Sequence, residues 1–322
     1  MSVLVYTESE NGKFKKNAFE VASYAKAVAD QLGTSVTAIS FNTSDNDSLG
    51  AYGVSKVLNV SNDNLKTFNA KAFASAIGQA VAKENATTII VSSSTDTKFL
   101  APLVAGKLQA GYVPNVVAAP ESTSPFMVKR TAFSNKGFAH TEISSDIKII
   151  GVSNNSFGAH ENGGTATVED FSPSLNDADF STKSIEVDKV VGKATIADAD
   201  IVVSAGRGLK GPENWGMIEE LADVLGAATA CSKPVSDLGW RPHGEHVGQT
   251  GKPVASNLYI AIGISGAIQH LAGVSSSKTK VVINTDPEAP FFKAADYGIV
   301  GDAFEVIPQL IEKLKDFKAQ NA

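Results

Sequence analysis

The sequence predicts an α/β protein with two domains. The N-terminal domain is expected to be a mainly parallel α/β sheet that ends in an antiparallel meander, and the C-terminal domain a doubly wound parallel sheet. Short apolar runs alternate with segments of helical spacing in both halves, as in parallel strands joined by covering helices. A length of 322 residues is enough for two hydrophobic cores. We place the domain boundary between residues 1–194 and 195–322.

The N-terminal elements follow from the change between strand-like and helix-like periodicity. Phe19, Ala22 and Val28, for example, share one face of a predicted helix, because apolar side chains recur there every three or four residues. The expected strands are residues 3–6, 35–41, 56–60 and 87–91, and the expected helices are residues 18–32, 68–83 and 99–108.

Hydroxyl side chains follow the strand at residues 87–91. The run Ser92-Ser93-Ser94-Thr95 lies at a carboxyl end, where open α/β sheets usually bind ligands. The same residue types form turns and helix N-caps. We favour the cap, because no glycine-rich phosphate loop accompanies the run, and a ligand contact is the alternative.

After residue 126 the pattern changes to extended runs with short polar links. Three such runs, at residues 126–133, 138–143 and 147–152, predict the antiparallel meander. Residues 154–173 are rich in Gly, Asn and Ser, which is typical of a loop or domain connection. Residues 183–191 are a further candidate strand.

The C-terminal half returns to alternating strands and helices. A helix is also expected to begin just after Ser265-Gly266, at the end of the apolar run NLYIAIGI. The expected strands are residues 200–205, 227–231, 257–264, 280–284 and 297–300, and the other helices are residues 213–225 and 303–317.

Composition excludes several classes of protein. The chain has 28 Lys and Arg against 34 Asp and Glu, a net charge of −6, which disfavours binding of nucleic acid by general electrostatics. Its single cysteine, Cys231, cannot form a disulfide framework and is expected to be a small buried residue in a reducing compartment. No leader precedes the first strand and the apolar runs are strand-length, so we expect a cytoplasmic protein that does not span a membrane.

Residues 206–211 read GRGLKG and match the dinucleotide fingerprint G-x-G-x-x-G between a strand and a helix. A NAD-binding unit would place an acidic residue at the end of the next strand, to bind the ribose hydroxyls. Ser232-Lys233 stands there instead. This departure argues against a nicotinamide dehydrogenase, and a glycine-rich connection that binds no ligand is a further alternative.

Several polar turns of the C-terminal half should meet at the carboxyl edge of its sheet. They include VGQTGK at residues 247–252 and the turn at residues 265–270, which supply hydroxyls, amides and cations suited to a phosphate-bearing cofactor. His243 and His246 could suggest a metal pair, but only Glu245 is available as a carboxylate partner, and we expect no metal site. We also identify no pair of nucleophile and general base.

Five segments carry a resemblance to a known family, in order along residues 200–317. GRGLKGPEN, CSKPVSDLGW, HVGQTGK, LYIAIGISGAIQHLAG and NTDPEAPFFKAADYGIVGD together resemble the FAD-binding domain of electron transfer flavoprotein alpha subunits. The spacing of VGQTGK and GISGAIQHLAG is highly specific to that family. The N-terminal half resembles the family's other domain more loosely, through its α/β pattern and its opening VLVYTE.

The resemblance implies a role for each matching residue toward an extended FAD. Arg207 and His270 would lie near the flavin, with His270 beside O2, and the hydroxyl of Thr250 would lie near N5. A cation or histidine at that place would stabilise an anionic reduced flavin and raise its potential. The implied contacts are Arg207, Ser232 and Lys233; His246, Val247, Gly248, Gln249 and Thr250 at the ring; Ser265, Gly266, Ala267, Ile268 and Gln269 at the diphosphate; His270; and Asn284 and Asp302 at the adenosine.

Two positions depart from the family pattern. Lys233 stands where many members have an arginine over the flavin; lysine keeps the charge but loses the planar stacking group. His246 replaces a common glutamine. Both differences are expected to affect the flavin's potential without affecting the fold.

The resemblance implies an electron carrier and not an enzyme with a substrate of its own. It would form a heterodimer with a beta subunit, where the family keeps a structural AMP, and we assign no AMP to this chain. FAD would accept electrons from flavoprotein dehydrogenases, such as the acyl-CoA dehydrogenases of fatty acid beta-oxidation, and pass them to a membrane quinone oxidoreductase. A NAD-dependent oxidoreductase that uses the GRGLKG loop and a nucleotide-binding protein without a redox role are the alternatives.

Overall fold

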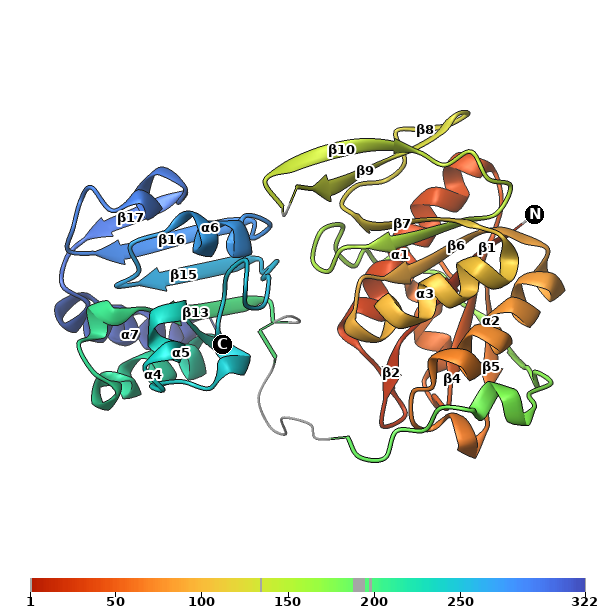
Figure 1. Cartoon of the computed structure of the whole chain (residues 1–322), viewed down its shortest axis with the longest axis horizontal. Helices are drawn as coiled ribbons and strands as arrows, with labels where there is room; N and C mark the ends of the chain where they lie inside the picture. The colour runs from red at the N-terminus through yellow and green to blue at the C-terminus, as the bar shows by residue number, and fades with distance from the viewer. Residues whose placement is uncertain (1, 134, 188–194, 197–198, 322) are drawn as a thin grey trace. The chain divides into compact units, whose positions relative to one another are not determined.

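The computed structural model describes residues 2–133, 135–187, 195–196 and 199–321 (Figure 1). The chain divides into two compact units, residues 1–132 with 137–188 and residues 133–136 with 189–322. The predicted boundary at residues 194/195 adjoins residues 188–194, which lie outside the described residues, and it stays a prediction. The candidate strand at residues 183–191 is irregular over 183–187, and its remainder also lies outside the described part.

The first unit is built on one mixed sheet, whose described strands run in the order β10-β9-β7-β11-β6-β1-β4-β5-β12. Neighbours from β7 to β12 along this order are parallel, whereas β9 pairs antiparallel with both β10 and β7. The strands are β1 (Ser2–Tyr6), β4 (Val36–Phe41), β5 (Lys56–Val60), β6 (Ala86–Ser92), β7 (Gly111–Val116), β9 (Phe126–Ala132), β10 (Gly137–Glu142), β11 (Lys148–Val152) and β12 (Thr167–Asp170).

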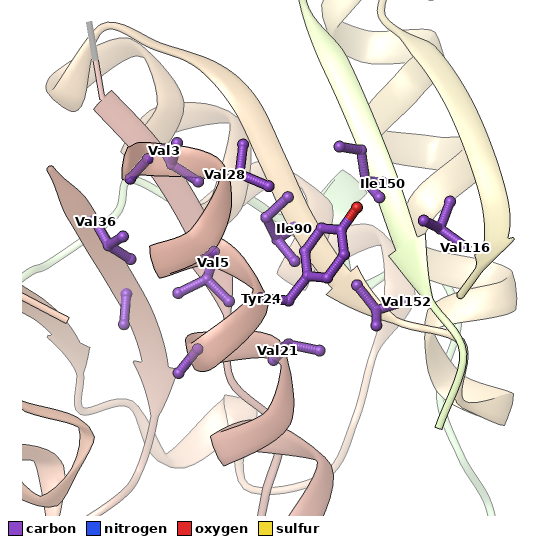
Figure 2. Packing of buried hydrophobic residues seen from close by; sticks show 14 of the residues in the cluster. Val3, Val5, Val21, Tyr24, Val28, Val36, Ile90, Val116, Ile150 and Val152 are labelled. Carbon is purple, nitrogen blue, oxygen red and sulfur yellow. The ribbon is translucent and has the colours of Figure 1, made fainter. Parts of the chain in front are cut away.

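Helices cover both faces of this sheet. α1 (Lys16–Leu32) packs on one face, and α2 (Ala70–Glu84) and α3 (Thr95–Leu108) lie side by side on the other. Successive side chains of β1 point to opposite faces of the sheet, so the strand contributes residues to two separate hydrophobic cores. On the α1 face, the ring of Tyr24 lies among aliphatic side chains of the central strands (Figure 2), and its hydroxyl donates to the carbonyl of Ala118 at 3.0 Å.

The predicted fold class is confirmed, with differences in detail. β9 and β10 form the expected antiparallel pair, but β11 lies between β6 and β7 as a parallel strand. Its sequence KIIGV is almost continuously buried, as a central parallel strand requires, whereas burial alternates along β10. The structure also contains strands that we did not predict, among them β7, which carries a glycine and a proline, and β12, inside the predicted loop.

The capping interpretation of the serine run is confirmed. Ser94 is the N-cap of α3, and its Oγ accepts from the backbone N–H of Thr97 at 3.2 Å. Ser92 is buried and donates to the carboxylate of Glu8, beyond the end of β1. These hydroxyls therefore hold the turn between β6 and α3 in place.

The second unit contains a parallel sheet with the described strand order β14-β13-β15-β16-β17. One face packs against α4 and α7, and the other against α6, residues 247–254 and Phe291. The elements are β13 (Ile201–Ala205), α4 (Gly216–Leu225), β14 (Ala228–Cys231), α5 (Lys233–Asp237), β15 (Leu258–Ile262), α6 (Ile268–Val274), β16 (Thr279–Asn284), β17 (Tyr297–Val300) and α7 (Ala303–Gln320).

This strand order produces a reversal beside β13. The chain passes from β13 to β14 on one side and then returns to β15 on the other. The loops that leave β13 and β15 therefore diverge, and open α/β sheets bind ligands in the crevice that such divergence leaves at the carboxyl ends.

Candidate cofactor-binding site

A cavity of about 520 Å³ lies at the carboxyl ends of β13, β14, β15 and β16, next to the reversal of strand order. Its size is within the ordinary range of ligand sites, roughly 300–1,000 Å³. The residues that line it are Arg207, Gly208, Ser232, Lys233, Pro234, His246, Val247, Gly248, Gln249, Thr250, Gly263, Ile264, Ser265, Ala267, Gln269, His270 and Asn284.

The structure brings most of the predicted cofactor contacts together around this one cavity. Gly266, Ile268 and Asp302 are the predicted contacts that are not part of its lining. Sequence reasoning missed Gly208, Pro234, Gly263 and Ile264. Gly208, Pro234 and Ile264 directly adjoin predicted contacts in sequence, and Gly263 lies two positions before Ser265, so their place just after strand ends was the available signal.

Two glycines of GRGLKG, Gly206 and Gly208, are required by contact between two loops. A Cβ on Gly206 would overlap the carbonyl oxygen of Gly263, and a Cβ on Gly208 would lie 2.6 Å from the Cα of Gly263. The backbone N–H of Gly208 donates to that same carbonyl at 3.2 Å. The segment forms 3₁₀ turns, and α4 begins only at Gly216, later than the predicted 213. The turns after β13 and β15 thus pack backbone against backbone.

Backbone hydrogen bonds hold the loop of residues 246–254 against the sheet edge. Val247 donates to the carbonyl of Cys231 at 3.0 Å, at the end of β14. Gln249 donates to the carbonyl of Gln269, and Val254 to that of Gly273, both at 2.8 Å. His246 and Val247 are buried, whereas the side chains of Gln249 and Thr250 remain exposed at the cavity.

Two predicted cofactor contacts, Asp302 and Asn284, form hydrogen bonds within the protein, and a third, Ile268, is largely exposed. Asp302 is the N-cap of α7, and its carboxylate accepts from the N–H of Phe304 at 3.0 Å. Asn284 lines the cavity, while its amide nitrogen donates to the carbonyl of Ile264 at 3.1 Å. Ile268 is two-thirds exposed. Their predicted contacts with a cofactor stay predictions.

Two buried histidines, His246 and His270, line the cavity. Neither Nδ1 atom has a hydrogen-bond partner among the residues that the structure describes. Burial lowers the pKa of His270 to about 4; the His246 ring adds to this shift, and the backbone of Val247 offsets part of it. Burial, together with His243 and Lys233, also lowers the pKa of His246, against an opposing effect of Asp237. Both rings are therefore neutral at neutral pH.

This depressed pKa predicts a pH-dependent stability. Between about pH 6.5 and 4 the unfolded chain takes up a proton at His270 that the folded chain refuses, so acid favours unfolding. We expect the free energy of unfolding to fall by up to about 3 kcal/mol across this window. Denaturant titrations of wild type and His270→Gln over this pH range measure the effect. Parallel pH profiles for the two proteins would contradict a buried neutral histidine.

Two cations line the cavity in different surroundings. Lys233 lies 3.9 Å from the carboxylate of Asp237, and both side chains are 60% exposed. Arg207 is exposed and makes no ion pair with a described residue. The charge of Arg207 is thus the less compensated of the two.

The surroundings of Cys231 do not activate its thiol, and those of His243 and His246 do not form a metal site. Cys231 is buried, and burial, with Glu245 adding to it, raises the pKa of its thiol to about 12. The two imidazole rings are 5.4 Å apart, but Glu245 is bound by Arg241 through two hydrogen bonds. The described residues contain no cluster of three metal-ligating side chains.

In the part of the chain that the structure describes, no helix has both the length and the apolar character needed to cross a membrane.

Both halves of the chain match models of known protein families. The family model for the electron transfer flavoprotein domain matches residues 3–176, and that for the electron transfer flavoprotein FAD-binding domain matches residues 195–275. The sequence is 36% identical to the electron transfer flavoprotein subunit alpha of Thermoanaerobacterium thermosaccharolyticum, over 98% of each chain.

Two further relatives agree. The subunit alpha of Bacillus subtilis is 35% identical over 97% of each chain. That of Paracoccus denitrificans is 36% identical over 98% of this chain and 100% of the relative. The resemblance and the cofactor FAD are therefore confirmed: the chain belongs to the family of electron transfer flavoprotein alpha subunits, and its C-terminal half contains the FAD-binding domain of that family.

Proposed function

We propose that this chain holds FAD in the cavity at residues 206–284 and works as one half of a heterodimer with an electron transfer flavoprotein beta subunit. In this role it accepts electrons from flavoprotein dehydrogenases, such as acyl-CoA dehydrogenases in fatty acid beta-oxidation, and passes them to a quinone oxidoreductase. The setting that we propose is the cytoplasm.

The observation that carries the proposal is the pair of buried histidines beside the cavity. A buried imidazole nitrogen without a partner costs free energy unless a ligand satisfies it, and the polar edge of an isoalloxazine offers both donors and acceptors. The exposed hydroxyls of Thr250 and Ser265 and the cation of Arg207 lie on the same lining. The donor set therefore fits a ligand with a polar ring and a diphosphate.

When bound, FAD supplies the redox chemistry, and the protein supplies binding and electrostatics. Arg207 and Lys233 provide positive charge, which favours the diphosphate and a negatively charged reduced ring. Gly206 and Gly208 keep the turn after β13 close to the turn after β15, so that both reach the ligand. The loop of residues 246–254, held by hydrogen bonds to α6 and the end of β14, would contact the ring.

A nicotinamide-dependent oxidoreductase is less well supported. The first two glycines of GRGLKG, Gly206 and Gly208, are explained by the contact with Gly263, without any approach to a pyrophosphate. A short 3₁₀ turn at Pro212–Asn214 separates this loop from α4, which begins only at Gly216. Ser232-Lys233 follows β14, where an acidic residue would bind ribose.

The test is to co-express the chain with a beta subunit and record the visible absorption spectrum. We expect a yellow complex whose flavin is reduced by an acyl-CoA substrate only when a flavoprotein acyl-CoA dehydrogenase is added, and is reoxidised by a quinone oxidoreductase. A colourless complex that takes up no FAD would refute the proposal. Direct reduction by NADH alone would favour the nicotinamide alternative.

A further inference from the structure

Tyr259 is the second residue of β15 and is fully buried. Its Oη is 3.0 Å from Nε2 of His270, and both atoms are shielded from water. Burial raises the pKa of Tyr259 well above its usual range, so the phenol keeps its proton. This contact joins a side chain of the sheet interior to a histidine of the cavity lining.

The bonding capacity of the two groups restricts how they share protons. A neutral imidazole has one N–H donor and one lone-pair acceptor, and a phenol has one O–H donor. If Tyr259 donates to Nε2, the imidazole proton must lie on Nδ1. If Nε2 donates instead, the proton of Tyr259 needs another acceptor, and Nδ1 becomes an acceptor.

The surroundings favour donation by Tyr259. Among the described residues, Nε2 of His270 is the only hydrogen-bond partner of the Tyr259 hydroxyl, so a phenol proton that pointed elsewhere would be buried without an acceptor. The hydroxyl of Ser204, one strand away, is also buried and has no hydrogen-bond partner among the described residues, so it does not accept the phenol proton. The hydrogen bond is therefore donated by Tyr259 to His270.

Packing keeps the two rings in this arrangement. The rings of Tyr259 and Phe291 are parallel within 2° at 6.4 Å, and the His270 ring lies 6.0–6.1 Å from both. Phe291 is fully buried, and its N–H donates to the carbonyl of Ser265 at 3.0 Å. The same aromatic cluster thus supports both His270 and the turn at Ser265.

We infer that Tyr259 is a positioning residue, which holds His270 as the neutral tautomer with its proton on Nδ1. His270 then offers the bound cofactor a fixed, uncharged hydrogen-bond donor. This inference rests on the proposed function for the identity of the acceptor, a polar atom of the FAD ring, but the tautomer itself can be measured without FAD.

The first test reads the tautomer directly in the full chain paired with its beta subunit, before and after removal of FAD. In protein labelled with ¹⁵N at histidine, long-range ¹H–¹⁵N correlations should show a protonated Nδ1 and an unprotonated Nε2 for His270. Tyr259→Phe keeps the ring but removes the donor, so the proton should shift toward Nε2. The matched control is Tyr24→Phe, which removes a buried hydroxyl in the other unit and should leave the His270 signals unchanged.

The second test asks whether Tyr259 acts through His270. Tyr259→Phe should weaken FAD binding roughly fivefold, the effect of one misplaced hydrogen bond. In a His270→Ala background the same substitution should have almost no effect on FAD affinity. A wild-type proton on Nε2, or an equal loss of affinity in both backgrounds, would overturn the inference. Failure of every variant to bind FAD would instead refute the proposed function, while the tautomer measurement would still decide the role of Tyr259.

Discussion

Replacing Gly206 with alanine is expected to abolish FAD binding and to destabilise the C-terminal unit by more than about 4 kcal/mol. The new Cβ would overlap the carbonyl oxygen of Gly263. Neither side of this contact can yield easily, because Gly206 donates to the carbonyl of Ile262 at 2.9 Å and Gly208 to that of Gly263 at 3.2 Å. Since both turns line the cavity, relieving the overlap would separate the residues that bind the cofactor.

Gly216 provides the matched control. It opens α4, and a Cβ there would meet no atom within 4 Å. Gly216→Ala should therefore leave FAD binding intact and raise stability by about 0.5–1 kcal/mol, because alanine loses less backbone entropy on folding. Denaturant unfolding and FAD titration of the two variants check both expectations. Retention of wild-type affinity by Gly206→Ala would show that the two turns can separate without harm.

The strands could be predicted from local sequence, and the place of the cavity followed from the strands. Tyr297–Val300 and Lys56–Val60 form strands at the predicted residues, because short apolar runs between turn residues specify strands locally. Once the C-terminal strands are taken as parallel, their carboxyl ends must share one edge. For that reason one cavity is lined by Arg207, Ser232 and Ser265, which follow three of these strands, and by Asn284, which ends a fourth.

What the sequence did not reveal depends on contacts between distant segments. β11 reads as another extended run after β10, and only its pairing with β6 and β7 makes it a central parallel strand. GRGLKG matches a dinucleotide fingerprint locally, yet Gly206 and Gly208 are required by their contact with Gly263, which is more than fifty positions away in the sequence. The bond between Tyr259 and His270 is likewise invisible without the fold, because one residue is in a strand and the other in a helix.

The structure also changes what is expected of the predicted cations. Lys233 is one of the two positions, with His246, at which the sequence departs from the family pattern. In the structure its charge faces Asp237, and both side chains are largely in solvent, where such pairs are worth little and counter-ions screen them. Arg207 has no such partner among the described residues, so its field at the cavity should be the stronger one.

Charge reversal at Arg207 should therefore weaken FAD binding far more than the same change at Lys233. Arg207→Glu changes the local charge by two units beside an anionic diphosphate, and at about 1–1.5 kcal/mol per unit we expect a loss on the order of 100-fold. For Lys233→Glu we expect about tenfold, because the new carboxylate joins Asp237 in a more solvated place. Fluorescence titration of the cofactor-free complex with FAD measures both.

The dependence on salt separates an electrostatic effect from a loss of packing. If Arg207 acts through its charge, the difference between wild type and Arg207→Glu should shrink steadily as ionic strength rises, because screening weakens the interaction in one protein and the repulsion in the other. Arg207→Gln, which removes the charge but keeps a long polar side chain, should show about half the loss in free energy. Equal losses at Arg207 and Lys233, unaffected by salt, would mean that the diphosphate does not lie near Arg207 and that the cofactor occupies the cavity in another orientation.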